Sequence, residues 1–175
     1  CDDGAGGSTS GVCGYGTDCL DCGNRPVTDT DQFDIEYVFK DDLSGLSSAE
    51  ELRVRTAFDA SRAKIQSVLF TSPGTYSFST ANDVCGVGWY TRQPTEPILD
   101  VLIVVEIVPI DGASGVLGSA GPCASLTRRT ITGKIKFDSA DVALMTSERL
   151  YYVALHESMH VLGIGTFWES IGVSN

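Results

Sequence analysis

The stretch from Leu99 to Val108 constrains the fold more than any other part of the chain. Nearly all of its residues are apolar, and many are β-branched. A short run of this kind, without alternation of polar and apolar residues, is typical of a strand that is buried on both faces. The sequence therefore predicts that residues 99–108 lie in the centre of a sheet.

Two further segments have the composition of strands. Residues 33–39 alternate, with Phe33, Ile35, Tyr37 and Phe39 on one side of the chain. This period of two predicts a strand with one buried face. Residues 131–137 are predicted to form a further strand of the same sheet.

A long helix is predicted between the first two strands, over residues 47 to about 70. Ser48 and Glu51 have the spacing of a capping box, and Pro73-Gly74 breaks the pattern. Apolar residues follow the cap at helical spacing: Leu52, Val54, Phe58, Ile65, Val68 and Leu69. The order of elements predicts an α/β fold of the α+β kind, in which this helix packs on a sheet.

A second helix is predicted over residues 147 to about 163, and it contains the motif His156-Glu157-Ser158-Met159-His160. Residues four apart lie on the same face of a helix, so His156 and His160 can present imidazole nitrogens to one metal ion. Zinc is the ion that this H-E-x-x-H pattern favours. Glu157 is placed where its carboxylate can reach a water molecule at the metal, which is the position of a general base.

The alternative is a structural amphipathic helix with two half-buried histidines. The chain has two histidines, and both are in the motif, whereas generic histidines would be scattered. Apolar residues at helical spacing give the helix a buried side: Leu150, Val153, Ala154, Met159 and Val161. Gly163 is predicted to end the helix in a left-handed conformation. These features favour the zinc site.

The net charge of −11 argues against binding to nucleic acid, because no basic patch is available to neutralise phosphates. Acidity of this kind mostly favours solubility. No run of about 18 apolar residues is present, so we expect no transmembrane segment.

Six cysteines divide between two parts of the chain: Cys1, Cys13, Cys19 and Cys22 near the start, and Cys85 and Cys123 in the body. Residues 1–27 have few large apolar side chains and are predicted to form a disulfide-stapled appendage to a body over residues 32–175. The even cysteine count indicates disulfides and an extracellular location, secreted or at the cell surface. A structural zinc site on the first four cysteines is the alternative, because Cys19 and Cys22 form C-x-x-C.

Three segments in order resemble a known family. They are Gly115-Val116-Leu117-Gly118-Ser119-Ala120-Gly121-Pro122-Cys123, then Gly133 to Asp138, then the histidine motif with Leu162-Gly163. The pattern G-x-L-x-x-A-x-P-C, G-x-x-x-F-D and H-E-x-x-H-x-L-G resembles the metzincin metalloproteases, and most closely the leishmanolysin-like group. The resemblance covers about residues 32–168. It implies a zincin fold, with a twisted mixed sheet, a backing helix and an active-site helix beneath a cleft.

The resemblance also implies roles for individual residues. It makes His156 and His160 zinc ligands and Glu157 the catalytic base of a zinc endopeptidase. It makes Val116, Leu117, Gly118, Ser119 and Ala120 the edge strand that binds a peptide substrate as an added strand. It places Cys123 just past that strand, and Cys85, the other cysteine of the body, is expected to be its disulfide partner.

The chain departs from the family at the third zinc ligand. Metzincins usually have a histidine six residues after the second one, and here that position is Thr166. Leishmanolysin-like enzymes postpone this histidine by an insertion, so we expect it beyond Asn175 and expect this chain alone to be incomplete and inactive. Glu169 is too close to His160 for a ligand of the glutamate-ligand families and is expected to be solvated.

Two other functions remain open on the sequence alone. One is an inactive zincin-fold module for binding or adhesion, and the other is a structural domain stabilised by zinc. A serine hydrolase is disfavoured, because Ser158 is the one serine near a histidine and lacks an acid-oriented histidine to activate it.

Overall fold

The structure is a computed structural model, and it describes residues 33–69, 75–76, 85, 98–127 and 129–167. The predicted appendage of residues 1–27, its four cysteines and Glu169 lie outside these ranges. The strands are β1 (Ile35–Phe39), β2 (Thr75–Tyr76), β3 (Ile98–Leu99), β4 (Val101–Val108), β5 (Gly118–Leu126) and β6 (Arg129–Asp138). The helices are η1 (Lys40–Leu43, a 3₁₀ turn), α1 (Ser48–Gln66), α2 (Ser139–Val142) and α3 (Ser147–Val161).

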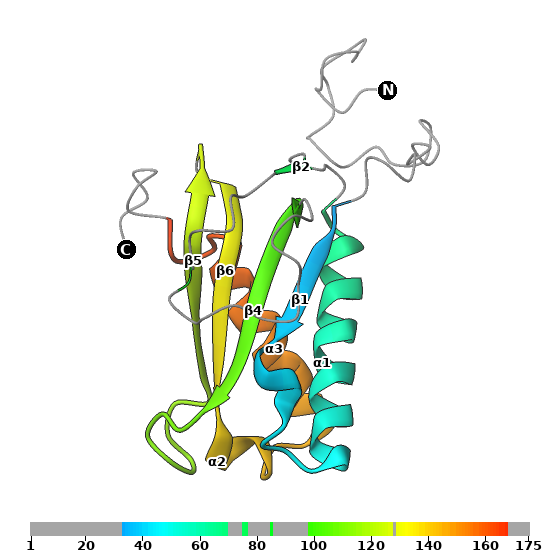
Figure 1. Cartoon of the computed structure of the whole chain (residues 1–175), viewed down its shortest axis with the longest axis vertical. Coiled ribbons are helices and arrows are strands. Elements are labelled where there is room, and N and C mark those ends of the chain that lie inside the picture. Colours follow the sequence, from blue (N-terminus) through cyan, green and yellow to red (C-terminus); the bar gives the residue numbers. More distant parts are fainter. Residues whose placement is uncertain (1–32, 70–74, 77–84, 86–97, 128, 168–175) are drawn as a thin grey trace, which may run out of the picture. The chain divides into compact units, whose positions relative to one another are not determined.

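Four strands form one twisted mixed sheet in the order β1-β4-β6-β5 (Figure 1). Strands β1, β4 and β6 are parallel, and β5 pairs with β6 in the antiparallel sense. The first six residues of β4 are all buried, on both faces of the sheet. The prediction that this run forms the centre of a sheet is therefore confirmed.

The apolar run is divided at Asp100, which the sequence did not predict. Asp100 has a positive φ of 61°, and its Oδ2 accepts a hydrogen bond of 2.7 Å from the backbone N–H of Asp34. Residues 98–99 belong to β3, which pairs with β2 in a separate two-stranded sheet. A short polar side chain tolerates this left-handed conformation, so Asp100 can turn the chain between the two sheets.

Helices α1 and α3 lie on the same face of the four-stranded sheet (Figure 1). The core between them contains alternate residues of each strand, as a strand with one buried face requires. Its largest fully buried side chains are Phe58, Phe137, Ile35, Ile65, Ile103, Ile135, Leu150, Val54, Val101, Val105, Val142 and Val161. The prediction of a mixed α/β fold with a backing helix is confirmed at this level.

The N-cap of α1 is Ser47, one residue before the predicted capping residue, Ser48. The capping box joins Ser47 and Glu50, not Ser48 and Glu51. Both pairs fit the sequence pattern, and only the structure decides between them. The helix ends at Gln66 and not near residue 70 as predicted, so Val68 and Leu69 lie beyond it. Leu52 is inside the helix at the predicted spacing, but it is 67% exposed.

The opposite face of the sheet carries a second apolar cluster of Ile98, Leu102, Val104 and Ile131, with Val38 and Cys85 packed against it. Cys85 forms a disulfide with Cys123, and their Cα atoms are 5.1 Å apart. The predicted pairing is confirmed. Cys123 lies inside β5, at an irregularity in the pairing with β6, and not just past the strand as expected.

Within the described ranges, no helix combines the length and the apolar character that a membrane crossing requires. Helix α1 is amphipathic and packs one side against the sheet.

Candidate metal and catalytic site

Helix α3 presents the H-E-x-x-H motif, and both of its ends are fixed by specific hydrogen bonds. At the start, the Thr146 side chain accepts from the N–H of Arg149. At the end, Gly163 has φ +103°, and the N–H groups of Gly163 and Ile164 bond to the carbonyls of His160 and Met159. These paired bonds form a Schellman motif. The predicted left-handed cap at Gly163 is confirmed.

The structure brings the two imidazoles together. Nε2 of His156 lies 3.0 Å from Nε2 of His160, and both rings are at least partly exposed. Two nitrogens bound to one zinc ion at about 2.0–2.1 Å and at the tetrahedral angle lie about 3.3–3.4 Å apart. The donor atoms therefore fit zinc in chemical type and in spacing, with an adjustment of a few tenths of an ångström.

The orientation of His160 is set by the chain that follows the helix. Its Nδ1 lies 2.8 Å from the carbonyl oxygen of Ile164. A carbonyl can only accept, so Nδ1 carries the hydrogen and Nε2 keeps its lone pair for a metal. Metal-binding histidines commonly have such a carbonyl partner. The turn that ends α3 thus prepares His160 for ligation through Nε2.

Gly165 allows this turn to approach the imidazole. It has φ +82°, and a Cβ atom there would lie 3.2 Å from Cε1 of His160. Thr166 occupies the position where the family pattern would have its third histidine. Its hydroxyl donates to the His160 carbonyl at 2.8 Å, so this side chain completes the helix end.

Glu157 lies on a different side of α3 from the imidazoles, as its place one residue after His156 requires. The residue is buried, with 6% of its surface exposed. Burial raises the pKa of Glu157 above its usual value, while the charges of His156 and His160 act in the opposite direction. A carboxyl whose pKa is moved toward neutrality is better suited to take up and release a proton.

Strand β5 covers Glu157 at Gly118. A Cβ atom at Gly118 would lie 3.2 Å from Cγ of Glu157 and 3.1 Å from the carbonyl oxygen of Lys136. Gly118, Ser119 and Ala120 of the predicted edge strand belong to β5, which does lie at the edge of the sheet. Val116 and Leu117 precede β5, so the predicted start of the strand is wrong by two residues.

The loop before β5 is held by a buried carboxylate. Oδ2 of Asp138 accepts hydrogen bonds from three successive N–H groups, those of Ile110, Asp111 and Gly112, at 2.8–3.0 Å. Its Oδ1 accepts from the N–H of Ala140 and caps α2. These backbone hydrogen bonds, that from Ala140 most of all, lower the pKa of Asp138. The loop that leads into β5 is thereby fixed relative to the end of β6.

The inner side of α3 is anchored to the sheet by polar contacts. The Ser158 hydroxyl donates its one hydrogen to the carbonyl of Ala154 at 2.7 Å. In the 2.8 Å bond between Tyr37 and Ser158, the Tyr37 hydroxyl is therefore the donor and Ser158 Oγ the acceptor. Thr130 of β6 donates to the carbonyl of Val161. Ser158 is fully buried.

Gly133 sets the distance between β6 and the end of α3. A Cβ atom at Gly133 would lie 2.2 Å from Cγ1 of Val161, a contact that no structure tolerates without movement. Valine in a helix has little rotamer freedom, so its side chain cannot turn away. We expect Gly133→Ala to lower the free energy of unfolding, measured by urea denaturation, by about 1–3 kcal/mol.

A double-mutant cycle checks the cause of this loss. Val161→Ala removes the atom that clashes, so the double variant should be more stable than the sum of the two single effects predicts. Gly121→Ala is the matched control, because its Cβ would meet nothing within 4 Å. Additive effects in the cycle would show that the contact with Val161 does not fix the spacing.

The sequence analysis did not predict several contacts of the site. Gly118, Gly133 and Gly165 each allow a close approach to α3 or to its side chains, and Tyr37 reaches α3 from β1. Glycines that flank a metal-ligand motif were a signal, but their contacts depend on the register of the strands. Phe167 is partly buried, and it packs over Gly163.

In the described part of the chain, His, Cys, Asp and Glu side chains do not gather into a group of three or more around one point. The site therefore offers two imidazole donors from α3. No protein-family model matches the chain, and no curated protein matches it. The resemblance to the metzincins consequently stays a prediction from sequence.

Proposed function

We propose that this chain carries the H-E-x-x-H part of the catalytic domain of a zinc-dependent endopeptidase of the leishmanolysin-like metzincin type. The observation that carries the proposal is the pair of Nε2 atoms 3.0 Å apart, with Nδ1 of His160 held by the Ile164 carbonyl. Both features prepare the imidazoles for one metal ion.

Zinc held by His156 and His160 would supply Lewis acidity toward a water molecule and a peptide carbonyl. A catalytic zinc site has three protein ligands, and the third would be the histidine that the resemblance places after residue 175. Glu157 would take a proton from the water as its oxygen attacks the carbonyl carbon. The same carboxyl would then give that proton to the leaving amine as the C–N bond breaks.

Strand β5 would hold the peptide substrate. It is the edge strand next to β6, and its residue Gly118 lies beside Glu157. An extended peptide can pair with such an edge through main-chain hydrogen bonds. The disulfide between Cys85 and Cys123 supports secretion or display at the cell surface, because disulfides persist in oxidising compartments.

Zinc binding tests the proposal directly. The chain has two histidines, so a ¹⁵N-detected imidazole spectrum of the oxidised protein contains two ring systems in all. We expect zinc to shift the Nε2 signals of both rings. Calorimetry should give a zinc affinity for His156→Ala that is at least about tenfold lower than that of the unmodified protein. Loss of a residue that only hydrogen-bonds to a metal ligand already lowers metal affinity by about 10–100-fold.

Tyr152→Ala is the matched control, because Tyr152 is exposed on the same helix one turn before His156. This variant should bind zinc as the unmodified protein does. If zinc shifted neither imidazole, the metal site would be wrong. If zinc bound but the full-length protein cleaved no peptide, an inactive zincin-fold module or a zinc-stabilised domain would replace the peptidase.

A further inference from the structure

The outer face of β5, turned away from α3, carries small residues beside two lysines of β6. Ser119 is paired with Lys136, and Gly121 is paired with Lys134. Paired residues of neighbouring strands point to the same face, and the alternate residues of β6, Ile135 and Phe137, are buried in the core under α3. The two lysines therefore project on the face opposite the candidate catalytic site.

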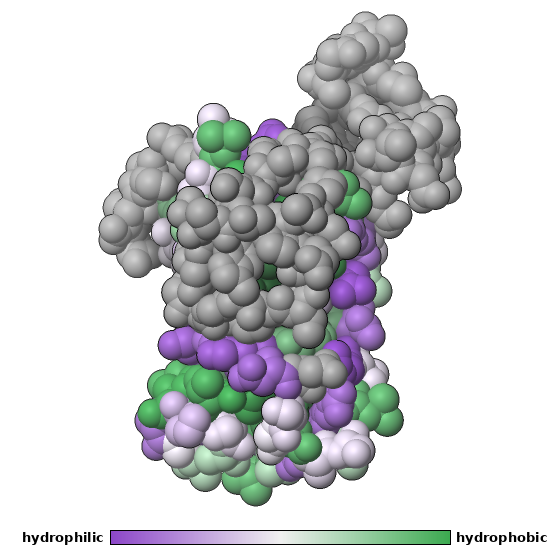
Figure 2. Space-filling view, in the orientation of Figure 1, coloured by the Kyte–Doolittle hydropathy of each residue, from purple (hydrophilic) through white to green (hydrophobic). Residues whose placement is uncertain are grey.

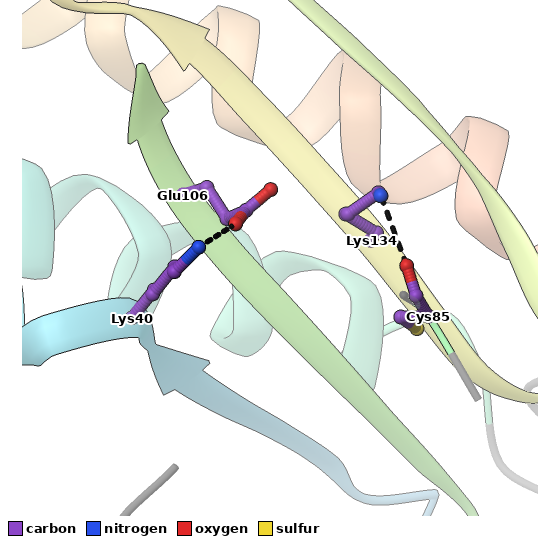
Figure 3. Close-up of polar contacts among 4 residues, drawn as sticks. All are labelled: Lys40, Cys85, Glu106 and Lys134. Carbon is purple, nitrogen blue, oxygen red and sulfur yellow. Dashed lines mark hydrogen bonds and ion pairs between the residues drawn. The ribbon is translucent and has the colours of Figure 1, made fainter. Parts of the chain in front are cut away.

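These lysines line an open pocket of about 430 Å³. The disulfide forms one wall, and Lys134 Nζ donates to the carbonyl of Cys85 at 3.0 Å (Figure 3). The pocket is lined by Cys85, Ser119, Ala120, Gly121, Pro122, Cys123, Lys134 and Lys136. Figure 2 views this outer face, where hydrophilic side chains form a band across the described part.

The charges of both lysines lack a carboxylate partner among the described residues. The acidic residue paired with Lys136 on β4 is Glu106, but its carboxylate bonds to Lys40 at 2.8 Å (Figure 3). Lys134 and Lys136 are each partly buried. In a chain with a net charge of −11, two ammonium groups in one pocket that have no carboxylate partner among the described residues suit an acidic ligand.

A peptide strand added to β5 would bring acidic side chains within reach of these lysines. Neighbouring strands are about 4.8 Å apart, so the added strand would lie about 10 Å from β6. Ser119 and Gly121 have little or no side chain to block the space between them. A lysine of β6 and a glutamate of the added strand can therefore extend toward each other across β5 and form an ion pair.

We propose that β5 selects peptide strands with two acidic residues at positions i and i+2, one for Lys136 and one for Lys134. Residues two apart in a strand share a face, as the two lysines do. The residue between them would face α3 and Glu157. The inference rests on the proposed function for the role of β5, and it adds the substrate class that this strand prefers.

Peptide binding tests this preference without zinc and without cleavage. Three labelled ten-residue peptides of the same length are compared by fluorescence anisotropy: glutamates two apart, glutamates adjacent, and glutamines two apart. We expect the first peptide to bind about 3–10-fold more tightly than the other two, as two partly exposed ion pairs allow. The preference should decrease at high salt.

Variants identify the residues responsible. Lys136→Met should abolish most of the preference for glutamate, whereas Lys64→Met, which removes an exposed lysine of α1, should leave it intact. Equal binding of the three peptides, or a preference that survives Lys136→Met and Lys134→Met together, would overturn the proposal. The proposal would also be overturned if inorganic phosphate displaced the labelled peptide as well as unlabelled peptide does, because that result would indicate a simple anion site. A failure of zinc binding would leave these results unaffected and would contradict only the peptidase.

Discussion

In the peptidase proposed above, Glu157→Gln should lower the rate of peptide cleavage by about 10²–10⁴-fold, with the zinc content unchanged. The substitution keeps the size and shape of the side chain and removes its basicity. Glu157 is buried between α3 and Gly118 of β5, on a different side of the helix from His156 and His160. Its loss should therefore affect proton transfer and leave the metal ligands in place.

Two measurements separate this effect from damage to the fold. Atomic absorption should give the same zinc content for Glu157→Gln and the unmodified protein, and their urea denaturation midpoints should be similar. Glu148→Gln, at an exposed position in the first turn of α3, is the matched control and should keep full activity. Full activity of Glu157→Gln would exclude the carboxylate as general base.

The sequence was informative where one local pattern determined one structure. The run from Leu99 to Val108 predicted an internal strand because it is apolar on both faces. Gly163 predicted the end of α3 because glycine readily adopts the left-handed conformation that often follows a helix. Periodicity also located α1, but it did not show that Leu52 is 67% exposed. An apolar residue at helical spacing can still point past the edge of the buried stripe.

Contacts between distant segments could not be predicted in this way. Asp138 accepts hydrogen bonds from three N–H groups, and Gly133 lies close to Val161. Both contacts depend on how β6 is placed against its neighbours. A shift of one residue in register would send these side chains to the other face. The motif gave the identity of the candidate ligands, whereas the tertiary structure gave the hydrogen bond that orients His160.

Phe58→Ala should lower the free energy of unfolding by about 3–5 kcal/mol. Phe58 is fully buried on α1 and contacts three aromatic rings from the sheet. Its ring centroid lies 4.9 Å from that of Tyr37, 5.6 Å from that of Phe39 and 5.4 Å from that of Phe137. Truncation would leave a cavity between α1 and two strands that cannot collapse, because β1 and β6 are held by their pairing with β4.

Urea denaturation measures this loss as a lower midpoint with an unchanged slope. Phe58→Leu fills part of the cavity and should be destabilised by less, so it provides a second measurement if Phe58→Ala does not fold. Leu52→Ala, on the exposed side of the same helix, should change the free energy of unfolding by no more than about 0.5 kcal/mol. Equal effects of Phe58→Ala and Leu52→Ala would contradict the packing of α1 on the sheet.

The Tyr37 side chain joins this aromatic cluster to Ser158 of α3. Phe58→Ala should therefore also loosen the helix that carries His156 and His160, and the NMR signals of the two imidazoles should broaden.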